Sequence, residues 1–172
     1  MNKMNKVITI DNMNITIPEG YTEITGEEAE KIIVCNGPAP MWSIYNAEKN
    51  VLLTASRIRT GLFTSIFMNA KDMANSIRKK YVSGLRIESV YGNTYSDVRE
   101  TCVDGNKAYT YSCTYRAISK DYEMVDMIRD TFVVKINDVF YLFEAIRNAA
   151  EVIPGANTTP VVYDSIQFAA AS

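Results

Sequence analysis

The sequence of residues 131–144 is TFVVKINDVFYLFE, and this stretch decides the fold. Asn137 and Asp138 tolerate the positive φ of a two-residue hairpin loop, so an antiparallel strand is predicted on either side of them. In that register one face of the hairpin carries only apolar or aromatic side chains and is predicted to lie in the core. Its residues are Phe132, Val134, Ile136, Val139, Tyr141 and Phe143.

The opposite face of the hairpin mixes apolar and polar side chains. Val133, Phe140 and Leu142 lie there among threonine, lysine and glutamate side chains. Apolar groups ringed by polar ones are typical of an interaction surface, so we take these three as candidate binding residues. The alternative is that the long helix described below packs on this face and buries it.

Alternation of apolar and polar residues predicts further strands on both sides of this hairpin. The predicted strands cover residues 7–10, 14–17, 42–46, 51–58, 86–91, 95–103, 107–118, 122–136 and 139–145. Turn-forming residues separate most of them, which favours a meander of antiparallel neighbours.

Three helices are predicted. A capping box of Thr25 and Glu28 begins one over residues 26–34. An amphipathic pattern predicts a longer one over residues 65–82. A threonine followed by a proline predicts a closing helix over residues 159–168. The apolar stripe of the long helix consists of Ile66, Phe67, Ala70, Met73, Ala74, Ile77 and Tyr81.

These elements predict one domain over residues 1–172, with a core from about residue 7 to about residue 168. The fold class is α+β, an antiparallel β-sheet meander with helices packed on it. A chain of 172 residues can bury a core large enough to fold without a disulfide or a structural metal.

The three cysteines, Cys35, Cys102 and Cys113, are expected to be free thiols. Their number is odd, and they lack the spacing of a metal site. A turn at Gly105 and Asn106 would offset Cys102 from Cys113 by four residues along paired strands, about 13 Å, which is too far for a disulfide bond.

The composition excludes several classes of function. The chain has no histidine, which removes histidine-based catalytic triads and the usual imidazole metal sites. Neither GxGxxG nor GxxxxGK is present. The net charge of −2 lacks the basic footprint of a nucleic-acid-binding protein. No segment approaches the roughly 20 apolar residues of a membrane span.

Four acidic residues could carry chemistry: Asp121, Glu123, Asp126 and Asp130. Paired carboxylates can serve as acid and base or bind calcium. However, alternate residues of a strand point to opposite faces, and no calcium-binding loop accompanies these four. We interpret them as solvated charges at the edge of a strand.

The tyrosines Tyr109, Tyr111 and Tyr115 share one face of a predicted strand. Aromatic stripes on sheets can stack on RNA bases, but basic residues do not surround this one. We interpret the stripe as packing beneath a helix, with the hydroxyl groups at its rim.

Four short motifs and the order of the elements resemble the PsbP/Mog-type α/β/α sandwich, a group that includes DcrB-like proteins and the Eag chaperones of type VI secretion. The motifs are NITIPEGY at 14–21, GNKAY at 105–109, VFYLF at 139–143 and YDSIQF at 163–168. The resemblance implies a non-enzymatic binding module that acts through partners.

The sequence therefore predicts a non-enzymatic protein-interaction or chaperone-like adaptor domain. Its expected partner is an unidentified protein or a second copy in a homodimer, with no nucleic acid and no membrane span. The alternative is a small-molecule-binding protein with an apolar pocket between sheet and helix. No cofactor or metal is expected, and the lack of an apolar signal segment predicts a cytoplasmic location.

Overall fold

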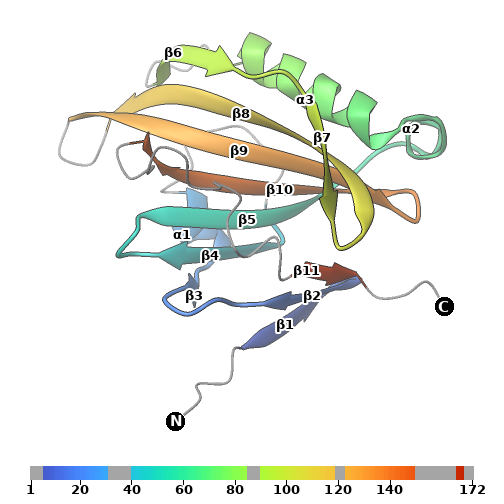
Figure 1. Cartoon of the computed structure of the whole chain (residues 1–172), viewed down its shortest axis with the longest axis horizontal. Helices are drawn as coiled ribbons and strands as arrows, with labels where there is room; N and C mark the ends of the chain where they lie inside the picture. Colours follow the sequence, from blue (N-terminus) through green and yellow to red (C-terminus); the bar gives the residue numbers. More distant parts are fainter. Residues whose placement is uncertain (1–5, 31–39, 85–89, 119–122, 150–165, 169–172) are drawn as a thin grey trace.

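The computed structural model describes residues 6–30, 40–84, 90–118, 123–149 and 166–168. Most strands form one eight-stranded sheet of order β3-β4-β5-β10-β9-β8-β6, in which β7 also pairs with β8 (Figure 1). Its pairs are antiparallel, which confirms the predicted antiparallel sheet. Strands β8, β9 and β10 are consecutive neighbours, as in a meander, whereas β5 pairs with β10. The strands are β3 (Thr22–Glu23), β4 (Trp42–Asn46), β5 (Val51–Ile58), β6 (Val90–Tyr95), β7 (Arg99–Val103), β8 (Asn106–Ile118), β9 (Met124–Ile136) and β10 (Val139–Asn148).

The β9–β10 hairpin has the predicted register, with Val139 paired to Ile136. Its loop residues Asn137 and Asp138 have φ values of 47° and 61°, the left-handed conformations that a two-residue turn requires. The predicted core face of this hairpin is buried. Its most deeply buried residues are Phe132, Val134, Tyr141 and Phe143.

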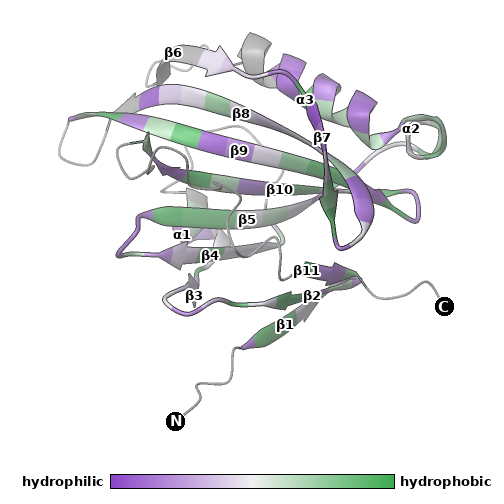
Figure 2. Cartoon of the chain, viewed as in Figure 1, coloured by the Kyte–Doolittle hydropathy of each residue, from purple (hydrophilic) through white to green (hydrophobic). Residues whose placement is uncertain are grey.

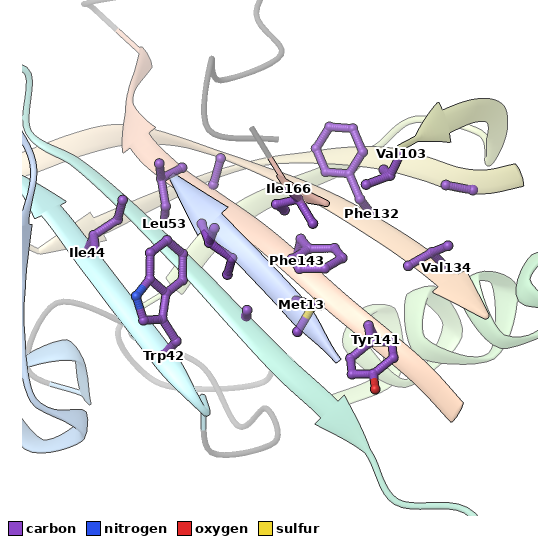
Figure 3. Packing of buried hydrophobic residues seen from close by; sticks show 14 of the residues in the cluster. Met13, Trp42, Ile44, Leu53, Val103, Phe132, Val134, Tyr141, Phe143 and Ile166 are labelled. Atoms are coloured by element: carbon purple, nitrogen blue, oxygen red, sulfur yellow. The ribbon is translucent and has the colours of Figure 1, made fainter. Parts of the chain in front are cut away.

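A second, three-stranded sheet covers this core face. Its order is β1-β2-β11, from β1 (Val7–Ile10), β2 (Met13–Thr16) and β11 (Ile166–Phe168). Met13 and Ile166 are both 1% exposed and pack with the aromatic residues of β9 and β10 (Figure 3). The main core therefore lies between the two sheets.

The closing helix predicted over residues 159–168 is wrong at its end, because Ile166–Phe168 is strand β11. Ile166 pairs with β2 and is 1% exposed, whereas Gln167 is exposed. This alternation is the burial pattern of a strand with one face on the core. Residues 159–165 lie outside the described part of the chain.

A hydrogen bond joins the turn of the small sheet to the large sheet. The Tyr141 hydroxyl donates to Asp11 Oδ2 over 2.7 Å, and Arg57 Nη1 lies 3.5 Å from the same oxygen. Burial, followed by the interaction with Asp11, raises the pKa of Tyr141 to about 12. The hydroxyl therefore remains protonated and able to donate at neutral pH.

The predicted capping box begins α1 (Gly26–Glu30). The Thr25 backbone N–H donates to Glu28 Oε2 over 2.7 Å, and the Glu28 N–H donates to Thr25 Oγ1 over 3.3 Å. Each side chain thus satisfies a backbone donor of the other residue. Residues 31–34 of the predicted helix lie outside the described part of the chain.

The single helix predicted over residues 65–82 is two helices, α2 (Leu62–Phe67) and α3 (Ala70–Gly84). Met68 has an extended backbone with ψ 134° and ends α2. Asn69 then begins α3, because its Oδ1 accepts the Asp72 N–H over 2.9 Å. The prediction missed this break because the apolar pattern continues across Met68 and Asn69, although the cap at Asn69 begins a new helix there.

Helix α3 packs on the second face of the large sheet, over β8 and β9 (Figure 1). Ala70, Met73 and Ala74 are at most 6% exposed and Ile77 is partly buried, which confirms this part of the predicted stripe. The side chain of Tyr81 lies outside the described part. No described helix is long and apolar enough to cross a membrane.

The strand predicted over residues 95–103 is interrupted: β6 ends at Tyr95 and β7 begins at Arg99, both paired with β8. Cys102 pairs with Lys107, since the turn lies at Asp104 and Gly105, whose φ values are 48° and 72°. The predicted turn was therefore one residue too late. Two positive-φ residues suit this tight turn better than Gly105 followed by Asn106.

Both described cysteines, Cys102 and Cys113, are free thiols, as expected, and Cys35 lies outside the described part. Cys102 is exposed, whereas Cys113 is 3% exposed. We therefore predict that iodoacetamide alkylates Cys102 readily in the native protein and Cys113 only after denaturation. Peptide mass mapping measures both, and equal native labelling of the two would contradict the placement of Cys113.

Two phenylalanines provide a matched test of the fold. Phe140 is fully buried beneath α3, and Phe67 is 79% exposed. Phe140→Ala should lower the free energy of unfolding by ~3–5 kcal/mol, through lost burial and a residual cavity. Phe67→Ala should change it by less than ~0.5 kcal/mol. Urea denaturation measures both, and equal midpoints would contradict the cover of β10 by α3.

Candidate functional site

Helix α2 carries a cluster of exposed apolar side chains. Leu62 is 73% exposed, Phe63 78%, Ile66 50% and Phe67 79%. The rings of Phe63 and Phe67 stack with centroids 6.5 Å apart. Elsewhere in the described part of the chain, the exposed large apolar residues are single ones in other elements, Val7 and Met124. We call the four residues of α2 the α2 patch, which Figure 2 shows largely in the hydrophobic colour.

Hydrogen bonds of the Met68 backbone hold the C-terminal end of α2 in place. The Met68 N–H donates to Thr64 O over 3.0 Å and closes the helix. Lys135 Nζ of β9 donates to Met68 O over 3.2 Å and attaches this end of α2 to the sheet. The cap at Asn69 then begins α3 at once. The α2 patch is thus presented by a short helix with a defined position.

A pocket of about 290 Å³ lies beside the C-terminal end of α2. One wall comes from α2 and the start of α3, and the other comes from β8 and β9. The lining residues are Ile66, Phe67, Met68, Asn69, Ala70, Lys107, Tyr109 and Lys135. The lining therefore combines apolar groups with two lysines and includes no carboxylate.

Both lysines interact with carboxylates just outside the pocket. Lys107 Nζ lies 2.7 Å from Glu100 Oε2, and Lys135 Nζ lies 3.0 Å from Asp138 Oδ1. The hydrogen bond from Lys107 lowers the pKa of the Glu100 carboxyl, and the same bond raises the pKa of Lys107. Lys107 and Glu100 are therefore both charged at neutral pH.

The lysines also lie over aromatic rings. Lys107 Nζ is 5.9 Å from the centroid of Tyr109, and Lys135 Nζ is 5.5 Å from that of Phe140. A cation above an aromatic face is attracted by the ring quadrupole. The Lys135 side chain is only 21% exposed and that of Lys107 is 61% exposed, so Lys135 is the more firmly positioned.

The predicted binding residues Val133, Phe140 and Leu142 do not form an exposed surface. All three are 0% exposed and pack against α3. The expectation of an open sheet face is therefore wrong, and the alternative, cover by the long helix, is what the structure has. The small side chains of Ala70 and Ala74 let the helix approach this face closely.

The predicted carboxylate candidates separate into different environments. Asp126 pairs with Arg116 at an exposed strand edge, as expected. Asp130 is instead 6% exposed, and its carboxylate accepts hydrogen bonds from Arg147 Nη2 at 2.7 Å and from Ser112. The expectation of a solvated Asp130 is wrong because the small sheet's side of β9 is covered. Asp121 lies outside the described part of the chain.

A second buried ion pair lies on the α3 side of the sheet. Arg129 Nη2 is 2.6 Å from Glu144 Oε2, and the two side chains are 4% and 6% exposed. Both charges pay a desolvation cost, and removing one partner would leave the other charge buried without its counter-ion. Within the described residues, no group of three or more His, Cys, Asp or Glu side chains is placed to hold a metal ion.

Two of the predicted packing tyrosines, Tyr111 and Tyr115, are 1% and 5% exposed, which confirms that they are buried. The expectation of hydroxyl groups at the rim is wrong for Tyr111, whose hydroxyl oxygen is buried as well. Burial raises the pKa of Tyr111 well above its ordinary value, so this hydroxyl stays neutral. Tyr109 is only partly buried, and it lines the pocket beside α2. The stripe therefore contributes one residue to the candidate site.

The α2 patch was missed in the sequence because Ile66 and Phe67 continue the apolar stripe of α3. Their exposure contradicts the prediction that they cover the core. A signal was available at Asn69, which stands three residues before Asp72 in the spacing of a helix N-cap. Because α3 begins at Ala70, Ile66 and Phe67 are not part of that helix and do not lie on its buried face.

No family model and no curated protein matches the sequence. Solved structures do match. Cyanobacterial PsbP (CyanoP) from Synechocystis sp. PCC 6803 is 12% identical with a TM-score of 0.52, over 91% of this chain and 86% of that one. The Saccharomyces cerevisiae Ran-binding protein Mog1p is 9% identical with a TM-score of 0.48, over 84% and 77%. A Pseudomonas aeruginosa protein described as a putative regulator is 8% identical with a TM-score of 0.41, over 86% and 85%.

The chain has the PsbP-like fold. The resemblance drawn from the four sequence motifs is thus confirmed at the level of the fold. At 12% identity the likeness to CyanoP concerns the fold alone. Residues for binding must therefore be argued from this chain's own surface.

The buried pair Arg129 and Glu144 generates a prediction about stability. Arg129→Met removes the guanidinium that neutralises a buried carboxylate and should lower the free energy of unfolding by ~3–5 kcal/mol. The double variant Arg129→Met/Glu144→Leu should recover at least about half of that loss, because no buried charge then loses its counter-ion. Urea denaturation measures both, and a double variant as unstable as Arg129→Met or less stable would contradict a coupled pair.

Proposed function

We propose that this chain is a non-enzymatic protein-interaction domain whose partner docks on the α2 patch. The observation that carries the proposal is the exposure of Leu62, Phe63, Ile66 and Phe67 on one short, positioned helix. Large exposed apolar clusters on folded proteins usually mark an interaction site. Aromatic residues near the centre of such a cluster are the typical anchors of binding energy.

Burial of the α2 patch by a partner would be favourable in free energy. Complete burial of a leucine, isoleucine or phenylalanine side chain contributes roughly 1.5–3 kcal/mol. The four side chains keep half or more of their surface in water, so several kcal/mol of hydrophobic free energy is available to a partner. The helix is already held by Lys135 and Asn69, which keeps the ordering cost of binding low.

We also propose that the domain acts in the cytoplasm as an adaptor or a chaperone-like protein. Free thiols at Cys102 and Cys113 support a reducing compartment. We also infer one domain over residues 1–172. The strands from Thr22 to Asn148 that share one sheet support this inference.

The second candidate function is binding of a small apolar ligand, which the pocket beside α2 favours. Its volume of about 290 Å³ lies at the lower end of small-molecule sites, which span roughly 300–1,000 Å³. Its wall residue Phe67 is 79% exposed, so a ligand there would remain largely in contact with water. The pocket suits one anchoring side chain of a protein partner better than a separate ligand.

The proposal is tested by comparative affinity capture from cells of the source organism. The immobilised protein is compared with Phe63→Ser/Phe67→Ser and with Val7→Ser/Met124→Ser, which changes exposed apolar residues outside α2. Partners should be retained by the wild type and by the control, and reduced at least about tenfold on the α2 variant. Equal urea midpoints of the three proteins show that the folds are intact.

Capture of the same proteins in equal yield on the α2 variant would contradict the proposal. Sedimentation equilibrium of the same three proteins tests the homodimer. If the wild type and the control associate while the α2 variant stays monomeric, the partner is a second copy. If none associates, the partner is a different protein.

A further inference from the structure

We infer that the partner presents an acidic, apolar peptide segment: one large apolar side chain enters the pocket beside α2, and a neighbouring carboxylate lies against Lys107 and Lys135. This inference rests on the proposed function, since it specifies what the partner of the α2 patch presents. Three features of the described residues carry it: the apolar wall, the two ammonium groups, and the position of the pocket between the end of α2 and strands β8 and β9.

The apolar wall continues the α2 patch into the pocket. Ile66 and Phe67 belong both to the patch and to the lining, and Met68 and Ala70 extend the wall to the start of α3. Tyr109 provides an aromatic surface on the opposite side, from β8. A leucine or aromatic side chain of a partner would therefore contact apolar groups on both sides.

The two ammonium groups define the charge of the segment. Lys107 and Lys135 belong to the lining, whereas the carboxylates that approach them, Glu100 and Asp138, lie outside it. The Glu100 and Asp138 side chains are 59% and 65% exposed, so these are surface ion pairs, which are weak and exchange easily. An incoming carboxylate can replace one of them. A partner that covers the α2 patch as well as the pocket excludes water from the new pair, which is then stronger than the one it replaces.

The two lysines have different parts in this arrangement. Lys135 is held by Met68 O and lies above Phe140, so it marks a defined position for a carboxylate. Lys107 is more exposed, so its ammonium group can attract a partner's carboxylate that approaches from several directions. Electrostatic attraction of this kind depends on ionic strength, which gives the experiment a second readout.

These features favour a peptide segment over the other possible occupants. A second copy docked through its own α2 helix would bring apolar side chains but no carboxylate for Lys107 or Lys135, since Leu62–Phe67 contains none. A membrane surface is flat and cannot fill a pocket between a helix end and two strands. An extended or helical peptide can insert one side chain and place the next beside Lys135.

The probe is a phage-displayed library of random peptides about twelve residues long, selected on the wild-type protein, with the enriched sequences then synthesised. Enriched peptides should carry Asp or Glu within about two residues of a leucine, isoleucine or aromatic residue. Lys107→Met and Lys135→Met should each weaken binding about fivefold or more by fluorescence anisotropy. The matched control Lys49→Met removes an exposed lysine in the β4–β5 turn and should leave it within about twofold. Raising the salt from about 50 to about 500 mM should weaken binding to the wild type.

The outcomes separate this inference from the proposed function. Peptides that lose binding with Phe63→Ser/Phe67→Ser, yet are uncharged and insensitive to both lysine variants, overturn the inference and leave the α2 patch as the binding site. Peptides insensitive to the α2 variant overturn both. Selection of no peptide above the background of uncoated beads overturns the inference. So does α2-dependent sedimentation with vesicles of phosphatidylcholine and about a third phosphatidylserine, which would assign the patch to a membrane surface.

Discussion

The structure depends on one constraint, which is that strand β10 is buried on both faces. Phe140 and Leu142 point to one side and Tyr141 and Phe143 to the other, and all four are at most 1% exposed. A two-sided apolar strand needs a cover on each side, because neither face can be left in water without losing its hydrophobic contribution. The small sheet β1-β2-β11 covers one face, and α3 covers part of the other.

The same constraint explains why α2 is exposed. Helix α3 covers Val133, Phe140 and Leu142 through residues that begin at Ala70, and Asn69 marks the start of that helix. The chain before Asn69 must therefore approach from beyond the sheet, where no described element lies over the apolar side chains of α2. The sheet face predicted to bind a partner is covered by α3. Ile66 and Phe67, which were predicted to cover the core, are instead exposed and available to a partner.

The sequence predicts well those features that short-range chemistry determines. The loop at Asn137 and Asp138 sets the β9–β10 register, and the capping box at Thr25 marks the start of α1. The sequence does not predict β11, because three residues become a strand only through pairing with β2, far away in the chain. Which apolar set is covered depends on where α3 begins, and the continuous apolar stripe through Phe67 obscured the start that the spacing of Asn69 and Asp72 indicates.

The candidate site exists because two separate parts of the chain meet at Lys135. Its ammonium group donates to Met68 O, which fixes the end of α2, and the same group lines the pocket with Tyr109 and Lys107. The apolar anchors come from the helix, and the charges come from β8 and β9, so neither part alone has the chemistry of the site. A rigid sheet holds the charges, and a bond to that sheet positions the anchors. The distance between an apolar contact and a charge contact is therefore set by the fold, which is how such a surface could select one peptide pattern over others.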